Sequence, residues 1–340
     1  MTLGTSIVIA TRNRLDYLKE AVAAVLSQSF GDLQLIVVDD ASTDDTMDWL
    51  NAHTDERLES ISLPEHSERA VALNTGLERA RGDFILFIDD DDRMAPGALE
   101  ILSGALESRP GAVGAIGGMR WFNVDGQFRK SPAFGDLVVG EVWSQILAGG
   151  NVERGQLLIR REVAIATGGW VPEIIISDDT YMALRVARLG PCVIVPDVVM
   201  EKRVHAENKQ AEDYADLDRR TRQVFLESLG PDQRELGEHA LSFFNQWMTA
   251  HTLYHRDHRY RSAFRIYRSL LKSAPELARG PLIWPRLKLA LIKSGAGSLP
   301  GSGVAMTIAR RVYSRARRVV GRYPAMGNFP NVHRDDRNYS

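Results

Sequence analysis

The sequence lacks several features that define large classes of proteins. It holds one cysteine, Cys192, in 340 residues, so no disulfide can form within the chain. We expect Cys192 to be a small core residue in a protein of a reducing compartment. The formal net charge is only −2, which argues against binding to nucleic acid through overall charge. We therefore expect no nucleic-acid partner.

Segments that direct a chain to export or into a bilayer are also missing. The first apolar stretch, at residues 6–10, is short, follows no basic region and runs into Arg12 and Arg14, unlike a signal peptide. No window approaches the roughly 18 uninterrupted apolar residues of a membrane span. The sequence has no P-loop motif for phosphate binding either. These absences predict a cytoplasmic protein.

The most informative segment that is present reads FILFIDDDD, at residues 84–92. Its apolar part has the length and composition of a strand buried on both faces. The adjacent carboxylates repel one another, and a divalent cation, which prefers carboxylate oxygens, would relieve that repulsion. Because open α/β sheets bind ligands at the carboxyl ends of their strands, the segment predicts a metal site at such an edge.

The first hundred residues alternate between strand and helix patterns. This order predicts an α/β fold with a mostly parallel, Rossmann-like sheet flanked by helices. We expect strands at 6–10, 33–38, 58–63 and 84–88, and helices at 15–29, at 70–80 and after a turn at 42–45. Farther on we expect helices at 96–109, 140–147 and 180–189, and strands at 111–122, 156–159, 193–195 and 198–200.

The chain changes character after about residue 208. Residues 209–293 read as a helical extension with helices at 213–229, 235–254 and 260–273. A linker rich in Gly, Ser and Pro follows at 294–303. Residues 304–340 hold a basic amphipathic helix, at 304–322, and a tail. Two alternatives stay open for this helix: it lies on the anionic inner face of a membrane, or it packs on the protein or on a second copy.

Acidic residues stand at the ends of three expected elements. The pair Asp39-Asp40 ends a strand, the aspartates at 89–92 follow another, and Asp178-Asp179 precedes a helix. A solvated turn or a helix cap would account equally well for any one of these. Because the ends of neighbouring parallel strands share one edge of a sheet, the three together favour one metal-dependent site for an anionic substrate.

A calcium loop and an aspartyl-phosphate site both fail to match the aspartate cluster. A calcium loop that starts at Asp89 fails at its fifth position, Arg93, and at the sixth it would need Gly where Met94 stands. The motif of an aspartyl-phosphate hydrolase needs Thr or Val where Arg93 stands. The cluster therefore indicates a metal-dependent site of another kind.

The motifs in this order resemble the family 2 glycosyltransferases, which bind nucleotide-sugars on a GT-A fold. The resemblance begins with SIVIATRNR at 6–14 and LIVVDDASTDDT at 35–46. It continues with ALNTGL at 72–77 and ARGD at 80–83, directly before the acidic cluster. GGW at 168–170 and the Asp178-Asp179 pair resemble the family's second half. The resemblance implies a GT-A nucleotide-sugar-binding and catalytic domain at residues 1–208.

The resemblance also implies a role for each matching residue. Asp179 would be the general base that takes a proton from the acceptor hydroxyl, with its pKa raised by Asp178, so that direct attack inverts the anomeric carbon. Asp91 would be the main ligand of a Mn²⁺ or Mg²⁺ ion at the diphosphate, with His205 as a second ligand or a structural residue. Asp40 would accept a hydrogen bond from the nucleotide base. The other nucleotide-binding residues would be Ala10, Thr11, Arg12, Arg69, Asn74, Asp89 and Asp90.

The implied donor is a sugar linked to UDP, GDP or dTDP, and the implied acceptor is a glycan or a lipid-linked sugar in cell-surface polysaccharide or glycolipid synthesis. Asp39 would support the loop that carries Asp40, and Asp92 would lie behind the metal ligand without binding the ion itself. Three positions depart from the family's pattern: Asp178 replaces Glu, Leu73 replaces an Arg, and Asp90 replaces a small residue. These departures leave open a non-catalytic nucleotide-sugar-binding or membrane-associated protein, and a metal-dependent phosphohydrolase is a third hypothesis.

Overall fold

The computed structural model describes residues 4–29, 31–123, 125–129, 138–205, 214–255, 257–283, 287–288 and 290–291. The expected linker at 294–303 and the basic helix at 304–322 lie outside the described residues. Among the described helices, none combines the length and the apolar character that crossing a membrane would require.

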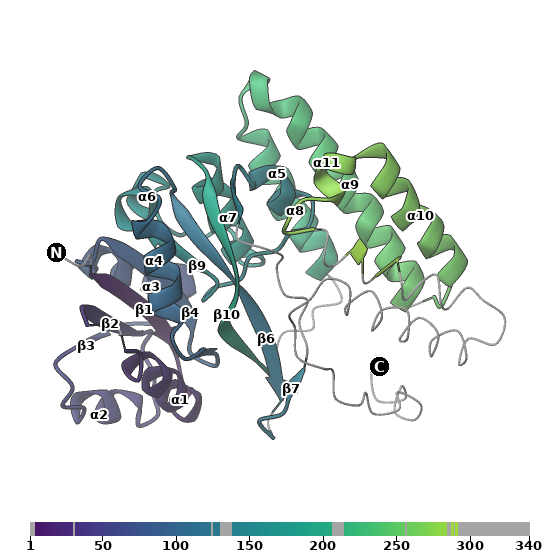
Figure 1. The fold of residues 1–340 in the computed structure, drawn as a ribbon. Helices are drawn as coiled ribbons and strands as arrows, with labels where there is room; N and C mark the ends of the chain where they lie inside the picture. Colours follow the sequence, from purple (N-terminus) through teal and green to yellow (C-terminus); the bar gives the residue numbers. More distant parts are fainter. Residues whose placement is uncertain are drawn as a thin grey trace.

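One sheet runs through the α/β part of the molecule (Figure 1). Its first half is parallel, in the order β3 (Leu58–Ser62), β2 (Leu33–Asp39), β1 (Thr5–Thr11) and β4 (Phe84–Asp89). The second half is mixed, because β9 (Leu157–Arg160) lies antiparallel between β4 and β6 (Gly114–Asn123). β6 then pairs in parallel with β10 (Cys192–Val204). The short strands β5 (Arg93–Met94) and β8 (Val138–Gly140) pair with β10, and β7 (Phe128–Arg129) pairs with β6.

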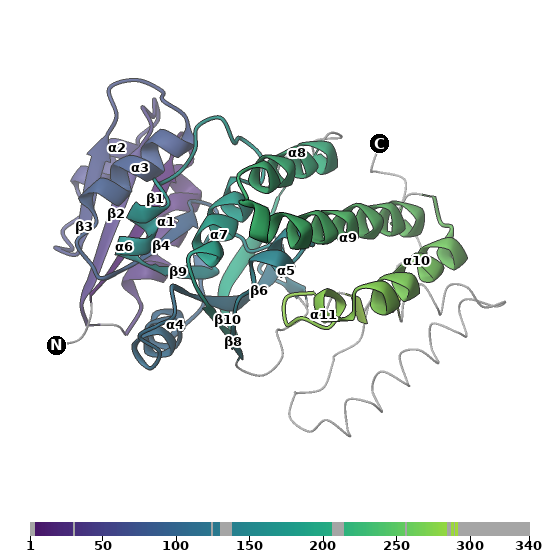
Figure 2. The same ribbon diagram turned by 90° about the horizontal axis from the view of Figure 1, so that it is seen from above.

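Helices cover both faces of the sheet (Figure 2). One core contains side chains of α1 (Leu15–Leu26), α2 (Thr46–Asn51) and α4 (Ala98–Glu107). The other contains those of α3 (Arg69–Arg79), α5 (Trp143–Leu147), α6 (Arg161–Ala166) and α7 (Asp178–Arg188). Because side chains alternate along a strand, Ile7 and Ile9 enter the first core and Val8 enters the second. Burial on both faces explains the continuous apolar runs, and the predicted α/β fold is confirmed.

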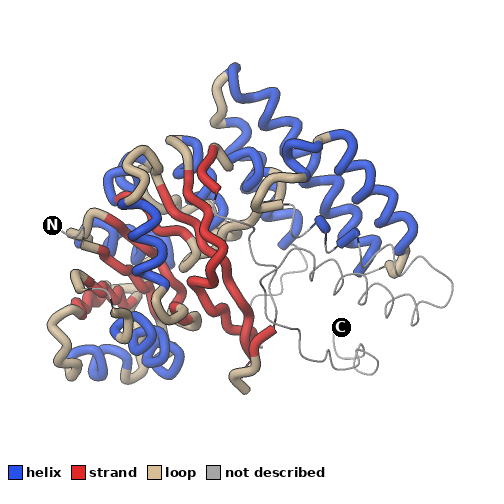
Figure 3. Tube along the Cα trace, viewed as in Figure 1, coloured by secondary structure: helices blue, strands red, loops and turns tan. Residues whose placement is uncertain are grey.

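The last described part of the chain is helical (Figure 3). It consists of α8 (Tyr214–Glu227), α9 (Pro231–His255), α10 (Tyr260–Ser273) and α11 (Pro275–Ala278). Phe225 of α8 lies against Trp143 of α5 and Tyr181 of α7, with ring centroids 6.3 and 6.5 Å apart. The core on the α7 face of the sheet continues into these helices. The helical extension therefore shares a hydrophobic core with the α/β part.

Two expectations for the second half of the α/β part, one for a strand and one for a helix, are wrong in detail. Residues 193–195 and 198–200 belong to one strand, β10, whose register against β6 shifts between Ile194 and Val198. Pro196 lies in that interval, and because proline has no N–H to donate, the ladder is interrupted there and resumes. The helix expected from residue 140 begins only at Trp143.

Cys192 lies fully buried in β10, as expected for a core residue. Burial raises the pKa of its thiol to about 12. Because the thiolate is the reactive form, burial and the raised pKa disfavour reaction of Cys192 at neutral pH.

Candidate active site

The register of the parallel strands brings two acidic segments to one edge of the sheet. β1 lies between β2 and β4, with Ala10 opposite Asp89. The Asp40 amide N–H donates to the Thr11 carbonyl at 2.9 Å. The Thr11 hydroxyl donates to the Asp90 carboxylate at 2.7 Å. The end of β1 therefore links Asp40 to the aspartate cluster.

The first two aspartates of the cluster have opposite electrostatic surroundings. Asp89 accepts two hydrogen bonds from the Arg154 guanidinium, at 2.6 and 3.2 Å. Burial alone would raise the pKa of Asp89, but the charge of Arg154 holds it below the ordinary value. Asp90 lies 3.3 Å from Arg14. Burial and the neighbouring charge of Asp91 raise the pKa of Asp90 to about 6.

Asp91 and Asp92 differ again in their partners. Asp91 accepts a hydrogen bond from Arg14 at 3.1 Å and lies 3.0 Å from the His205 Nε2 atom. One oxygen of Asp92 accepts the Arg203 amide N–H at 2.8 Å. The other oxygen is buried and meets no hydrogen-bond partner among the described residues. Burial raises the pKa of Asp92 well above its ordinary value, so the four acids are not interchangeable.

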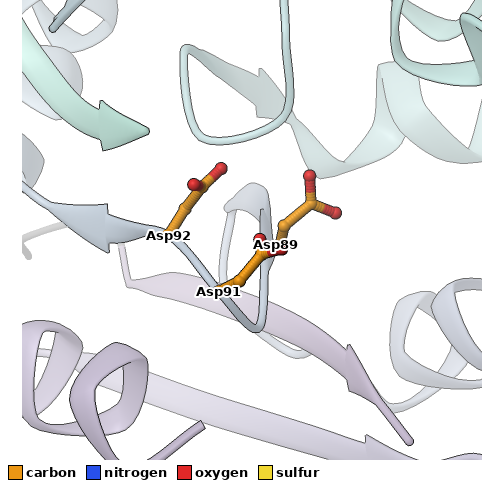
Figure 4. A group of neighbouring side chains, drawn as sticks. All are labelled: Asp89, Asp91 and Asp92. Carbon is orange, nitrogen blue, oxygen red and sulfur yellow. The ribbon is translucent and has the colours of Figure 1, made fainter. Parts of the chain in front are cut away.

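Three of these acids form a group that can hold a divalent cation. One carboxylate oxygen from each of Asp89, Asp91 and Asp92 lies within 4.8 Å of the others (Figure 4). Hard cations such as Mn²⁺ and Mg²⁺ prefer oxygen ligands, and an ion would satisfy the second oxygen of Asp92. His205, in contact with Asp91, offers a ring nitrogen at the same place. The donor set therefore fits the expected metal.

The acids at the end of β2 hold two different loops. The Asp40 carboxylate accepts the Ser67 amide N–H at 2.7 Å and lies 2.7 Å from the His66 Nδ1 atom. Asp39 is fully buried and accepts the Ser42 amide N–H at 3.1 Å. Asp39 therefore supports the turn after β2, whereas Asp40 faces the loop before α3.

The third acidic pair forms the first turn of α7. Asp178 accepts a hydrogen bond from Arg154 at 2.8 Å and lies 3.1 Å from the Arg69 guanidinium. Asp179 is half-buried. Burial raises the pKa of Asp179 to about 6, an effect that Arg154 opposes and Asp178 reinforces. A carboxylate with that pKa is ionised at neutral pH and still basic enough to accept a proton.

Arg154 joins the separate parts of the site, and sequence analysis missed it. It is a buried residue of the loop between α5 and β9, and its guanidinium bridges Asp89 and Asp178. The guanidinium carbon lies 5.5 Å from the centre of the Trp170 ring. Its one signal in the sequence is its place just before the strand expected at 156–159. The end of β4 and the start of α7 are thus tied to one side chain.

A second cation, Lys202 of β10, was also missed. Its ammonium forms an ion pair with Glu153, the neighbour of Arg154. Burial lowers the pKa of Lys202, but the charges of Glu153 and Asp92 more than offset this, so the net pKa is raised. The ammonium therefore stays charged and compensates buried carboxylates.

The remaining predicted residues lie around this centre. Arg69, the first residue of α3, pairs with Asp178, and Arg12 lies exposed just beyond β1. Both amide atoms of Asn74 bond to the main chain of Trp170, at 2.7 and 2.8 Å. Asn74 thus ties α3 to the turn at 168–170. Nucleotide binding by these residues, and by Ala10 and Thr11, stays a prediction.

Comparison with solved structures identifies the class of fold. The chain is similar to S. aureus TarS in complex with UDP-GlcNAc, with 16% identity, a TM-score of 0.59 and coverage of 95% of this chain and 93% of that one. It is also similar to the mannosyltransferase PcManGT from Pyrobaculum calidifontis in complex with GDP-Man and Mn²⁺. There the identity is 20%, the TM-score 0.53 and the coverage 87% and 86%. At these identities the likeness shows the fold alone, and the predicted GT-A architecture is confirmed.

Comparison of sequences identifies the family. Residues 6–168 match the model of Glycosyl transferase family 2. Escherichia coli WfaP, a UDP-Glc:alpha-D-GlcNAc-diphosphoundecaprenol beta-1,3-glucosyltransferase, is 39% identical over 87 residues, which cover 26% of this chain and 35% of WfaP. The Campylobacter jejuni GalNAc(5)-diNAcBac-PP-undecaprenol beta-1,3-glucosyltransferase is 35% identical over 100 residues, or 28% of this chain and 32% of the relative. This part of the chain is therefore a family 2 glycosyltransferase domain, and the matches span about a third of those relatives' lengths.

Proposed function

We propose that the protein is an inverting, metal-dependent glycosyltransferase that moves a sugar from a nucleotide-diphospho-sugar to an acceptor hydroxyl. The observation that carries the proposal is the bridge from Asp89 through Arg154 to Asp178, which joins the expected donor site to the carboxylate pair of α7. The raised pKa of the neighbouring Asp179 is typical of a group that moves a proton. The raised pKa therefore favours a catalytic role over the alternative of a non-catalytic binding protein.

The donor would bind at the carboxyl edge of the parallel strands. Asp89, Asp91 and Asp92, with His205 beside them, would hold Mn²⁺ or Mg²⁺, which supplies Lewis-acid stabilisation of the leaving diphosphate. Asp40 would accept a hydrogen bond from the nucleotide base. Two proteins of the same fold support a nucleotide-sugar donor, because their structures contain UDP-GlcNAc in one case and GDP-Man with Mn²⁺ in the other. We therefore expect a sugar linked to UDP, GDP or dTDP.

The carboxylates of α7 would serve the acceptor. Asp179 takes the proton of the acceptor hydroxyl while the oxygen attacks the anomeric carbon and the bond to the diphosphate breaks on the opposite face. A single displacement of this kind inverts the configuration of that carbon. Asp178 stays paired with Arg154 and Arg69, which fixes the first turn of α7 during the reaction.

The acceptor would be a glycan or a lipid-linked sugar of the cell surface. The names of the two relatives described above contain a diphosphoundecaprenol-linked sugar, which supports a lipid-linked acceptor. The protein would then work in the cytoplasm at the inner face of the membrane, held there by the basic residues 304–322. Unchanged liposome binding after deletion from residue 304 onward would refute the membrane contact.

Calorimetry tests the donor site directly. UDP, GDP and dTDP are titrated in Mn²⁺ into the wild type, Asp91→Ala and the control Asp16→Ala, which removes a fully exposed carboxylate. We expect one nucleotide to bind the wild type and the control equally, and to bind Asp91→Ala at least about tenfold more weakly. No binding of any nucleotide, or equal binding by Asp91→Ala, would contradict the proposal.

A further inference from the structure

Helix α8 touches both of the loops that meet in the ion pair between Arg154 and Asp178. One loop, at residues 148–156, leads from α5 to β9 and carries Arg154. The other, at residues 171–177, leads into α7 and ends at Asp178. Two adjacent residues of α8, Thr221 and Arg222, bond to one loop each. The helical extension therefore reaches the centre of the site through neighbouring side chains.

Arg222 holds the first loop and the end of α5 together. Its side chain has no exposed surface. The Nη1 atom donates to the carbonyl of Leu147 at 3.1 Å and to that of Ile146. The Nη2 atom donates to the side-chain oxygen of Asn151 at 2.5 Å. Asn151 lies in the loop that carries Arg154, so Arg222 fixes the backbone from which Arg154 extends.

Burial of the Arg222 guanidinium costs desolvation free energy. Arg222 is compensated by Asp218 at 3.2 Å and lies 4.2 Å from the centre of the Phe244 ring. A buried ion pair is commonly no more stabilising than apolar residues of the same volume would be. The planar fork of donors does, however, bind several oxygens in one fixed geometry. The arrangement therefore favours a role for Arg222 in position rather than in stability.

Thr221 holds the second loop. Its hydroxyl donates to the carbonyl of Ile176 at 2.9 Å. The next residue, Ser177, has a φ of 55°, in the left-handed region that non-glycine residues rarely occupy. A residue in such a conformation persists only where its surroundings hold it. The bond from α8 thus fixes the turn that places Asp178 at the start of α7.

We propose that Thr221 and Arg222 are positioning residues, and that α8 clamps the two loops so that Arg154 and Asp178 meet. The inference rests on the proposed transferase function, because the bridge from Asp89 to Asp178 links the donor site to the base Asp179. The helical extension is then part of the catalytic machinery. Loosening the clamp separates Arg154 from Asp178 without changing any group that touches the substrates.

Two variants and two matched controls isolate the clamp. Arg222→Lys keeps the charge but cannot reach the α5 carbonyls and the loop at once. Thr221→Val keeps the shape and removes the hydroxyl, and it carries the test should Arg222→Lys fail to fold. The first control, Arg219→Gln, removes a guanidinium that in the wild type bonds to Asn245 of α9 at 3.0 Å. The second control, Thr249→Val, removes a hydroxyl that in the wild type bonds to a carbonyl of its own helix at 2.9 Å.

The decisive measurement is a double-mutant cycle on kcat/KM for sugar transfer. In the wild-type background, we expect Arg222→Lys and Thr221→Val to lower kcat/KM on the order of 10- to 100-fold, as small misplacements of catalytic groups do. In an Arg154→Ala background, each should cost less than about threefold, because its effect passes through Arg154. Each control variant should have the same kcat/KM as the background into which it is introduced. Equal losses in both backgrounds, or no loss in the wild type, would overturn the proposal.

Hydrogen exchange separates the clamp from the function that it serves. We expect faster amide exchange across residues 148–156 in Arg222→Lys and across residues 171–177 in Thr221→Val, with unchanged protection of α1 and α4 on the opposite face of the sheet. A wild type that transfers no sugar from any donor contradicts the proposed function, and exchange alone then decides the clamp. Unchanged exchange in both loops overturns it.

Discussion

The aspartates of the site carry the same carboxyl group but differ in how readily it ionises. Arg154 keeps Asp89 ionised, whereas burial raises the pKa of Asp90 and of Asp179 to about 6. The charge of a carboxylate follows its surroundings, and sequence motifs do not contain those surroundings. The positions of the acids and the raised pKa of Asp179 were therefore predictable, although burial contributes more to that shift than Asp178 does. The pKa shifts of Asp89, Asp90 and Asp92 were not predictable.

The raised pKa of Asp179 predicts a pH dependence with a definite sign. A general base works only when ionised, so kcat should fall about tenfold per pH unit below about 6 and level off above it. The measurement is kcat at saturating donor from about pH 4.5 to pH 8.

Asp90 is the matched control, because its pKa is also raised to about 6. Asp90→Asn removes this second titration and leaves Asp179 in place. We expect the acidic limb of the profile to persist in Asp90→Asn. Loss of the limb in that variant would assign it to Asp90 and contradict the role of Asp179.

At the scale of elements, the sequence reveals what local patterns encode. It does not reveal which distant strands pair. The parallel strands β1, β2 and β4 were predictable because continuous apolar runs end in turn residues. The antiparallel place of β9 depends on pairing with β4 and β6, which no local pattern encodes. Arg154 escaped for the same reason: its partners, Asp89 and Asp178, lie 65 and 24 residues away along the chain.

The contact between α3 and β1 is so close that one added methyl group should disturb it. A Cβ at Gly76 of α3 would lie 2.3 Å from a methyl carbon of Val8, a stiff side chain in the core. We expect Gly76→Ala to lower the free energy of unfolding by about 1–3 kcal/mol. Urea unfolding monitored by circular dichroism measures the change.

Gly104 of α4 provides the control, because a Cβ there meets no atom within 4 Å and the position is exposed. Gly104→Ala should raise the free energy of unfolding by roughly 0.5–1 kcal/mol through helix propensity. A Gly76→Ala variant as stable as Gly104→Ala would contradict the packing described for α3.

At the scale of the whole molecule, the helical extension covers one side of the α/β part. Trp143 of α5 and Tyr181 of α7 pack against Phe225 of α8 within a continuous core. The change in composition near residue 208 predicted a helical extension, and the first described helix beyond it, α8, begins at Tyr214. Its shared core was not predictable, because a helix's apolar face does not reveal its partner.

A truncation after residue 208 tests whether the expected catalytic domain folds alone. Removal of α8–α11 exposes the apolar side chains that α5 and α7 bury against them, so we expect aggregation or loss of cooperative unfolding. Size-exclusion chromatography and thermal unfolding report both. A truncation after residue 293, which keeps α8–α11, is the control and should unfold cooperatively. A monomeric, cooperatively folded 1–208 fragment would contradict this dependence.

Sugar transfer by wild type and Asp179→Asn is the most direct test of the proposed function, with Glu173→Gln as a control for the loss of an exposed carboxylate in the loop before α7. We predict transfer from one nucleotide-sugar to an acceptor hydroxyl, with inversion at the anomeric carbon by NMR. Asp179→Asn should lose at least about 100-fold in kcat while still binding the nucleotide. Turnover by Asp179→Asn at the wild-type rate, or a product of retained configuration, would contradict the account.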